Sequence, residues 1–436
     1  MINSFEEAEQ YLNDMPRFTS KHTIEETKSF LEKMGSPDKN MKIIHVAGTN
    51  GKGSTCAYLN SVLVKAGIKV GLFTSPHLVD ICERFCIDGC AISHETFLES
   101  FLKIYNSLDW ANSDKENFYH PTYFEYLFFM AMDIFAGENI EWCILETGLG
   151  GLLDATNSVH HKEAAVIAKI GLDHMEYLGN TIPLIAEQKA GIIEEDGVVV
   201  YNDTLHEASE VIENVAKRKN ATFFGVSADS FLAKKEKTSE SIDFLMVDGY
   251  YKGVLLSLKT IAQYQLQNAA LAIKTIENTS LKEVITPEIL KAGIDSAFWA
   301  GRMEQVSPNV FLDGAHNPDG IAAFISTVRE DGYDDKRSLL FGVVADKNYE
   351  EMIDELITSR LFSDITIAPL HTGRSAQVRD LIKVFESYEN INLAVSEDTI
   401  DGLKKVLKKK VPGERVYITG SLYLVGEIKK YFEECK

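Results

Sequence analysis

The feature that most constrains this chain is a glycine-rich loop between a short apolar run and a helical segment. Residues 42–47 read KIIHVA, which is typical of a buried strand, and residues 48–54 read GTNGKGS. Residues 54–67, STCAYLNSVLVKAG, have the pattern of a helix. The loop glycines allow backbone N–H groups to face an anion at the helix start, where Lys52 adds positive charge. The loop therefore predicts a polyphosphate site.

This loop departs from the common phosphate-binding pattern at two positions. Val46 stands where that pattern has its first glycine, and Gly53 stands where it has a hydroxyl residue. Ser54 or Thr55 is expected to cap the helix that follows. Because the loop lies between a strand and a helix, phosphate binding is favoured over a simple glycine turn.

The remaining pattern alternates strands with helices, which is typical of a parallel α/β sheet. Apolar runs predict strands of a first domain at 69–75, 141–146, 164–170 and 198–201, with helices at 122–135, 185–193 and 206–219. Residues 241–259 alternate partly around an Asp-Gly pair, which predicts an antiparallel hairpin, and helices from about Gln263 and Pro287 close the domain.

A second series of strands, each followed by a helical stretch, begins after a predicted hinge at 299–302. Its strands are expected at 309–313, 337–344, 364–369, 391–395 and 415–419. We therefore predict an α/β fold with two domains. Residues 1–298 form a large, mostly parallel-sheet domain of the P-loop ATPase type, and residues 299–436 form a smaller Rossmann-like α/β domain.

Composition narrows the class of protein. A formal net charge of −21 argues against nucleic acid as a partner, because phosphates repel an acidic surface. The acidic N-terminus lacks the features of a signal peptide, and no apolar run is long enough to span a bilayer. We expect a cytoplasmic monomer without a membrane partner.

Six cysteines in a chain of this length do not indicate a disulfide framework. Three of them, Cys82, Cys86 and Cys90, recur every fourth residue, but this spacing matches no common zinc pattern of paired cysteines. They are interpreted as reduced thiols, buried or partly exposed, rather than as a metal site.

Several longer motifs distinguish this sequence from other α/β proteins with a phosphate-binding loop. They are HVAGTNGKGST, TSPHL, ERF-x-IDG, ETGLGGLLDATN, GLDHMEYLGNTIPLIAEQKAGII, GRMEQV, LDGAHNP and TGSLYLVGE. In this order, over nearly the whole chain, they resemble the folylpolyglutamate synthase and dihydrofolate synthase family, which is related to the Mur ligases of peptidoglycan synthesis.

The resemblance implies a set of site residues. Ser75, Glu146 and His174 would bind Mg²⁺, and Lys189 would be carboxylated by CO₂. ATP would contact Asn50, Gly51, Lys52, Gly53, Ser54, Asn268, Arg302 and Asp313. Lys52, Lys189 and His316 would act in catalysis, and a pterin compound would contact Thr122, Leu153, Asp154 and Ala155. A hydroxyl and a carboxylate are ligands that Mg²⁺ prefers, whereas a lone histidine or lysine would by itself indicate nothing more than a structural residue.

The reaction implied is ATP-dependent addition of L-glutamate to a folate through an acyl phosphate. Dihydropteroate is an alternative acceptor, and His77 in TSPHL is similar to bifunctional members of the family. A need for K⁺ stays open. The rival hypotheses are a Mur-type amino-acid ligase acting on a cell-wall precursor, a nucleotide-switch protein and a noncatalytic relative. The phosphate loop lies too early for the extra domain of a Mur enzyme, and no N-K-x-D guanine pattern is present.

Overall fold

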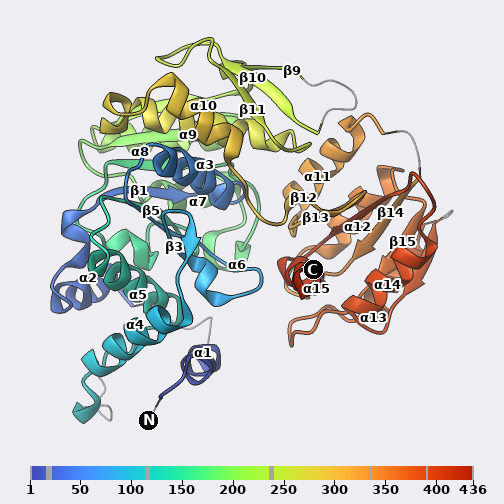
Figure 1. Ribbon diagram of the computed structural model, residues 1–436, viewed down its shortest axis with the longest axis horizontal. Helices are drawn as coiled ribbons and strands as arrows, with labels where there is room; N and C mark the ends of the chain where they lie inside the picture. Colours follow the sequence, from blue (N-terminus) through green and yellow to red (C-terminus); the bar gives the residue numbers. More distant parts are fainter. Residues whose placement is uncertain are drawn as a thin grey trace. The chain divides into compact units, whose positions relative to one another are not determined.

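The chain forms two compact units, which are described in turn. The computed structural model describes residues 2–15, 22–112, 118–234, 240–333, 336–388 and 391–434. Unit 1 comprises Met1–Phe231, Met246–Val254 and Gln267–Ala297, and unit 2 comprises Leu232–Leu245, Leu255–Leu266 and Phe298–Lys436. Figure 1 shows their elements in chain order. Within the described ranges, every helix is too short or too polar to cross a membrane.

Unit 1 is built on an eight-stranded sheet with the order β4-β3-β2-β5-β1-β6-β7-β8. The bounds are β1 (Lys42–Ala47), β2 (Val70–Phe73), β3 (Phe85–Ile87), β4 (Cys90–Ala91), β5 (Trp142–Glu146), β6 (Ala164–Ile167), β7 (Val198–Asn202) and β8 (Thr222–Val226). The six strands from β2 to β8 in this order are parallel, and β3 and β4 extend the sheet as an antiparallel hairpin. The phosphate-loop strand β1 therefore lies in the middle of the sheet.

Helices surround this sheet. They are α1 (Phe5–Asp14), α2 (Ile24–Lys33), α3 (Lys52–Lys65), α4 (His94–Ser107), α5 (Tyr123–Gly137), α6 (Met175–Leu178), α7 (Ile182–Ala190), α8 (His206–Arg218) and α10 (Pro287–Ser296), and α9 (Tyr264–Glu277) spans the division between the units. From its second residue onward β1 is buried at every position, on both sets of alternate side chains. The sheet is therefore covered on both faces, as parallel sheets are.

Helix α5 forms the centre of the largest core cluster in unit 1. Nearly all its residues between Tyr123 and Phe135 are buried, with Phe128, Phe129 and Met130 completely so. A helix that is apolar on all sides must be enclosed by other elements, and aromatic residues of α4 and β3 supply part of that enclosure. Thr122 starts the helix through a capping box with Glu125.

Unit 2 contains a six-stranded sheet with the order β12-β13-β17-β14-β15-β16. Its strands are β12 (Arg302–Ser307), β13 (Val310–Asp313), β14 (Arg337–Phe341), β15 (Asp364–Ile367), β16 (Asn392–Val395) and β17 (Arg415–Thr419). Its helices are α11 (Pro318–Glu330), α12 (Tyr349–Thr358), α13 (Val378–Glu386), α14 (Thr399–Lys409) and α15 (Leu422–Glu434). All neighbouring strands are parallel except β12, which pairs antiparallel with β13.

The predicted hairpin is also present. Strands β10 (Ile242–Met246) and β11 (Leu255–Leu258) pair antiparallel, and β9 (Phe231–Lys234) completes a three-stranded sheet. The predicted α/β fold, with a large and mostly parallel sheet followed by a smaller α/β part, is therefore confirmed.

One local prediction is wrong. Helix α3 begins at Lys52, and its N-cap is Gly51, so Ser54 and Thr55 lie inside the helix rather than before it.

Helix α3, which follows the phosphate loop, is held in place by α10. The two helices lie side by side (Figure 1). Ser61 Oγ donates a hydrogen bond of 2.8 Å to the carbonyl of Gly293, and a Cβ atom added at Gly293 would lie 2.5 Å from the Cα atom of Val62. The two backbones approach this closely because position 293 has no side chain.

The Gly293→Ala substitution is expected to lower the free energy of unfolding by about 1–3 kcal/mol, because the added methyl group would overlap the backbone of α3. Gly137→Ala is the matched control. Gly137 is also a helical residue, but a Cβ atom there meets nothing within 4 Å. This control should leave stability unchanged or raise it by up to about 1 kcal/mol. Equal effects of the two substitutions in urea unfolding would contradict this account.

Candidate active site

The phosphate loop is tied to the chain that follows β6. The N–H groups of Thr49 and Asn50 both donate to the carbonyl of Lys169, at 2.8 and 3.2 Å. The hydroxyl of Thr49 also bonds the carbonyl of Gly171, at 3.0 Å, and lies 3.1 Å from its N–H group. Because β1 and β6 are neighbours in the sheet, these bonds hold the loop above the carboxyl end of β1.

Gly51 is constrained in two ways. Its φ angle is +88°, a left-handed conformation that favours glycine, and a Cβ atom here would overlap Oδ1 of Asn268. The structure thus brings together Gly51 and Asn268, two predicted nucleotide-binding residues from distant parts of the sequence. Lys52 and Gly53 follow in the first turn of α3, where the N–H groups have no partner within the helix. These groups are suited to an anion.

Two lysine side chains reach the same loop carbonyl. Lys52 Nζ lies 3.0 Å from the oxygen of Gly48, and Lys189 Nζ lies 2.8 Å from that oxygen. Lys189 comes from α7 and is only 4% exposed. The start of α3 and the last turn of α7 therefore place two amino groups beside one carbonyl oxygen.

The predicted metal ligands follow neighbouring strands. Ser75 comes after β2, Glu146 ends β5, and His174 lies in the segment after β6. The order β2-β5-β1-β6 brings the carboxyl ends of these strands together around the phosphate loop. The Ser75 N–H group donates to Glu146 Oε2 at 3.0 Å, so these two residues are in contact. His174 is a left-handed residue with φ +52° that precedes α6, and its side chain is about one-third exposed.

Two hydroxyl groups close to these residues in sequence are buried without a partner in the described part of the chain. They are Thr55 Oγ1, in the first turn of α3, and Thr147 Oγ1, which follows Glu146. The Thr147 N–H group donates to the carbonyl of Val46, so Thr147 lies beside the end of β1. A buried hydroxyl without a hydrogen bond lowers the free energy of unfolding by about 1–3 kcal/mol. A bound ligand that forms the missing hydrogen bond would remove this cost.

A buried hydrogen-bond chain links β1 to the loop at 149–157. Thr156 Oγ1 donates to Asp154 Oδ1 at 2.5 Å and accepts from His45 Nε2 at 2.8 Å. The other carboxylate oxygen of Asp154 accepts from the N–H group of Leu149. Burial holds the pKa of His45 well below its ordinary value, so the imidazole is neutral and can act as this donor. Asp154, predicted to contact substrate, is 1% exposed and shapes its own loop.

The other residues predicted to contact an acceptor differ in their exposure. Thr122 caps α5, Ala155 is buried, and Leu153 is 55% exposed. Further large apolar side chains are exposed along the same loop, in the segment before α6, and along α6 and α7: Leu152, Leu172, Met175, Tyr177 and Leu184. Close contacts at Gly150, Gly179 and Gly191 hold these segments against one another. The sequence analysis missed this apolar surface because it depends on which leucines the fold leaves uncovered.

Lys162 joins the 149–157 loop to the end of α7. Its Nζ atom donates to Asn157 Oδ1 at 2.7 Å and to the carbonyl of Ile192 at 3.0 Å. Lys162 is 6% exposed, and burial lowers its pKa to about 8 although Glu194 opposes the shift. The sequence analysis missed this residue, since nothing in HHKEA distinguishes it from a surface lysine.

Unit 2 brings together its own predicted residues. Arg302 and Asp313 are directly opposite on β12 and β13. Asp313 is 2% exposed and accepts hydrogen bonds from the N–H groups of Met303 and Ala315, at 3.1 and 2.9 Å, and from the hydroxyl of Tyr264, at 2.6 Å. Burial raises the pKa of Asp313, and Arg302 opposes this rise. His316 Nδ1 lies 2.8 Å from the carbonyl of Gly314. Tyr264 is an additional residue that the sequence analysis did not identify.

Comparison with known proteins adds independent information. Residues 46–276 match the Mur ligase middle domain, and residues 301–422 match the Mur ligase, glutamate ligase domain. A Bacillus subtilis protein named dihydrofolate synthase/folylpolyglutamate synthase is 35% identical over 437 residues, which cover 99% of each chain.

Two solved structures are similar over almost the whole length. The folylpolyglutamate synthase of Mycobacterium tuberculosis complexed with ADP has a TM-score of 0.88, 25% identity and 98% coverage of both chains. The Escherichia coli protein FolC, in complex with DHPP and ADP, has a TM-score of 0.85 and 25% identity, with 99% of this chain and 98% of that chain covered.

The low pKa of Lys162 gives a pH-dependent contribution to stability. Lysine in the unfolded chain has a pKa near 10.5, so above about pH 8 the unfolded state holds a proton that the native state releases. The unfolding free energy of the native sequence, minus that of Lys162→Met, should therefore rise by about 2 kcal/mol from about pH 8 to about pH 10. Urea unfolding at each pH measures this difference. Lys217→Met, which removes an exposed lysine, should show no such trend, and a flat difference for Lys162→Met would contradict the assignment.

Proposed function

The chain belongs to the folylpolyglutamate synthase/dihydrofolate synthase family of Mur ligases, and from this membership we propose that it adds L-glutamate to a folate with conversion of ATP to ADP and phosphate. The observation that supports the proposal best is the loop at residues 48–53. It combines an anion-binding helix start with two lysines on one carbonyl, and Asn268 packs against its central glycine. A ligase that transfers the γ-phosphoryl group of ATP needs such a concentration of N–H groups and positive charge.

The reaction proceeds in two steps in this proposal. A carboxylate oxygen of the acceptor takes the γ-phosphoryl group of ATP, which gives an acyl phosphate and ADP. The amine of glutamate then attacks the acyl carbon, phosphate leaves, and an amide forms with loss of a proton from the amine. Lys52 neutralises charge on the phosphates during the first step. No side chain of the protein forms a covalent bond with the substrate.

The residues at the ends of β2, β5 and β6 are suited to Mg²⁺. Ser75 and Glu146 provide oxygen ligands and are in contact, and the partnerless hydroxyls of Thr55 and Thr147 can bond an ion's water molecules or phosphate oxygens. We propose Ser75, Glu146 and His174 as the ligands. When bound, Mg²⁺ would neutralise charge on the phosphates of ATP.

The acceptor is proposed to lie along the exposed apolar surface that includes Leu153. A pterin is a flat aromatic ring system, and exposed leucine, methionine and tyrosine side chains beside a polar centre are typical of sites for such ligands. Thr122, Asp154 and Ala155 are proposed as supporting residues, since Thr122 and Asp154 already stabilise local backbone.

The two family matches support different roles for the two parts of the chain. Residues 1–298 would bind ATP and the folate, and residues 299–436 would form the glutamate ligase domain; the family matches at 46–276 and 301–422 support this proposal. Within the second part, Arg302 and Asp313 are proposed to act on the nucleotide and His316 to act in catalysis. The three residues lie close together on β12, β13 and the loop that follows β13, which supports their action at the same site.

Phosphate release from Mg-ATP and L-glutamate should require a pterin acceptor. The purified protein is assayed with dihydropteroate, with tetrahydrofolate and without acceptor, each with and without K⁺. Activity with tetrahydrofolate alone indicates a folylpolyglutamate synthase, and activity with both indicates a bifunctional enzyme. Absence of activity with every pterin, beside an active control enzyme, would contradict the proposal and favour a cell-wall precursor as the acceptor.

Lys52→Ala should lower this activity by a factor of about 10² to 10³, because it removes a charge that stabilises the transferring phosphoryl group. Lys65→Ala is its matched control. Lys65 lies in the last turn of the same helix and is exposed, so its loss should leave activity within about twofold of the native enzyme.

Lys189 is proposed to carry CO₂ as a carbamate. The added carboxylate would replace a buried positive charge with a negative one and could hold a cation beside the phosphates. Protein equilibrated with ¹³C-bicarbonate should show a ¹³C carbamate resonance that Lys189→Met lacks and Lys217→Met retains. A native protein without this resonance, while active with pterin acceptors, would overturn the carbamate but not the ligase assignment.

A further inference from the structure

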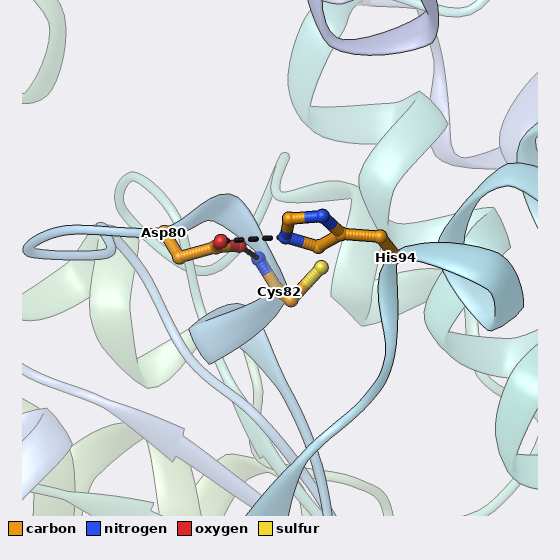
Figure 2. A group of neighbouring side chains, drawn as sticks. All are labelled: Asp80, Cys82 and His94. Carbon is orange, nitrogen blue, oxygen red and sulfur yellow. Dashed lines mark hydrogen bonds and ion pairs between the residues drawn. The ribbon is translucent and has the colours of Figure 1, made fainter. Parts of the chain in front are cut away.

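We propose that Asp80, Cys82 and His94 form a binding site for one Zn²⁺ ion, separate from the ligase chemistry. The Asp80 carboxylate, Cys82 Sγ and a ring nitrogen of His94 all lie within 4.8 Å of one another. Cys82 lies in the 3-10 turn Ile81–Arg84, directly after Asp80, and His94 is the first residue of α4. Figure 2 shows the Asp80 carboxylate facing a ring nitrogen of His94, with the Cys82 sulfur beside the imidazole ring.

A tetrahedral zinc ion requires these side chains to move, because one pair of ligand atoms is too close and Cys82 Sγ is known only to lie within 4.8 Å of the other two. Ligand atoms of zinc are about 3.4–3.6 Å apart, given bond lengths of about 2.0–2.3 Å. Asp80 Oδ2 and His94 Nε2 are 2.7 Å apart, as expected when they share a proton, so this pair has to open by about 0.7 Å. The side chains of Asp80 and His94 are 40% and 54% exposed, which leaves room for that movement. A water molecule can complete the coordination.

Local structure already orients each ligand. Asp80 Oδ1 accepts from the N–H group of Cys82 at 2.8 Å, which leaves Oδ2 directed at His94. The carboxylate of Glu83 accepts from the N–H groups of Leu78, Val79 and Asp80 and so fixes the backbone on that side. The ring of Phe5 stacks on His94 with a centroid distance of 3.6 Å. Little ordering entropy would therefore be lost when a metal binds.

The charge around Cys82 also favours a cation. The carboxylates of Asp80, Glu9 and Glu83 all act electrostatically on the Cys82 thiol. The same negative charges attract a divalent ion, which would displace the thiol proton and bind the thiolate. A sulfur, a nitrogen and an oxygen ligand together suit zinc, whereas Mg²⁺ takes oxygen ligands. The choice of metal distinguishes this site from the proposed magnesium site.

The test measures zinc and cobalt binding to the full chain, prepared without a polyhistidine tag and freed of metal by a chelator. Excess Mg²⁺ is present throughout, so that the proposed magnesium site is saturated. One Zn²⁺ per chain should remain after gel filtration, and Co²⁺ in its place should give the charge-transfer absorption of a cobalt–thiolate bond. Cys82→Ser should abolish that absorption, and His94→Gln should lower zinc affinity at least about tenfold.

Two controls keep the result interpretable. Cys90→Ser removes an exposed thiol close to the site and should change neither measurement. His94→Gln alters an exposed side chain, so it tests the proposal even if Cys82→Ser folds poorly. Absence of bound zinc, or zinc binding that survives both Cys82→Ser and His94→Gln, would overturn the site. Ligase activity with Mg²⁺ and a pterin is measured separately, so failure of either proposal is recognised independently of the other.

Discussion

The carbonyl oxygen of Gly48 is the point at which two lysine side chains of the proposed active site meet. Lys52 and Lys189 both donate to it, so their ammonium groups are no more than about 6 Å apart. At that distance two positive charges repel by about 3 kcal/mol at an effective dielectric constant near 20. A polyphosphate between them would turn repulsion into attraction. Conversion of Lys189 to a carbamate would do the same from the protein side, and would then require a cation to balance the phosphates.

The sheet order explains why so many polar groups can gather around this carbonyl. Strands β2, β5, β1 and β6 are adjacent, so the segments that follow them emerge at one edge although they are distant in sequence. Backbone bonds fix two of these segments to each other, from Thr49 and Asn50 to Lys169, while α10 supports the helix that follows the loop. The loop is thus held from both directions. Because backbone hydrogen bonds and a neighbouring helix fix the shape of the loop, few of its side chains are needed for that purpose. The remaining side chains are available to bind ligands.

Local patterns allowed much of the fold to be predicted, and long-range contacts account for what was missed. The strand at 42–47 and the helix after it follow from apolar runs and glycines, and Lys52 was recognised from its place between them. The helix cap was predicted wrongly because Gly51, with its left-handed φ angle, starts the helix three residues earlier than a cap at Ser54 would.

Residues whose importance depends on a distant partner could not be found in this way. Tyr264 matters because the fold brings its hydroxyl to Asp313, and Lys162 because Asn157 and Ile192 enclose it. In the sequence Cys82 is one of three cysteines at every fourth position, but in the structure its neighbours are a carboxylate and an imidazole. The assigned roles of Ser75, Glu146 and His174 rest on family resemblance, since a serine, a glutamate and a histidine separated by many residues form no pattern of their own.

The outer strands of the two large sheets also limit how this chain can associate through its backbone. In unit 1 the sheet ends on one side at β4, which has only two residues, and on the other at β8, which contains Gly225. In unit 2 the outer strand β12 has two irregularities in its pairing with β13. Short, glycine-containing or bulged outer strands are poor templates for an incoming strand. The same architecture that exposes the carboxyl ends of the strands to small molecules thus makes three of the four outer strands, β4, β8 and β12, poor templates for edge-to-edge aggregation.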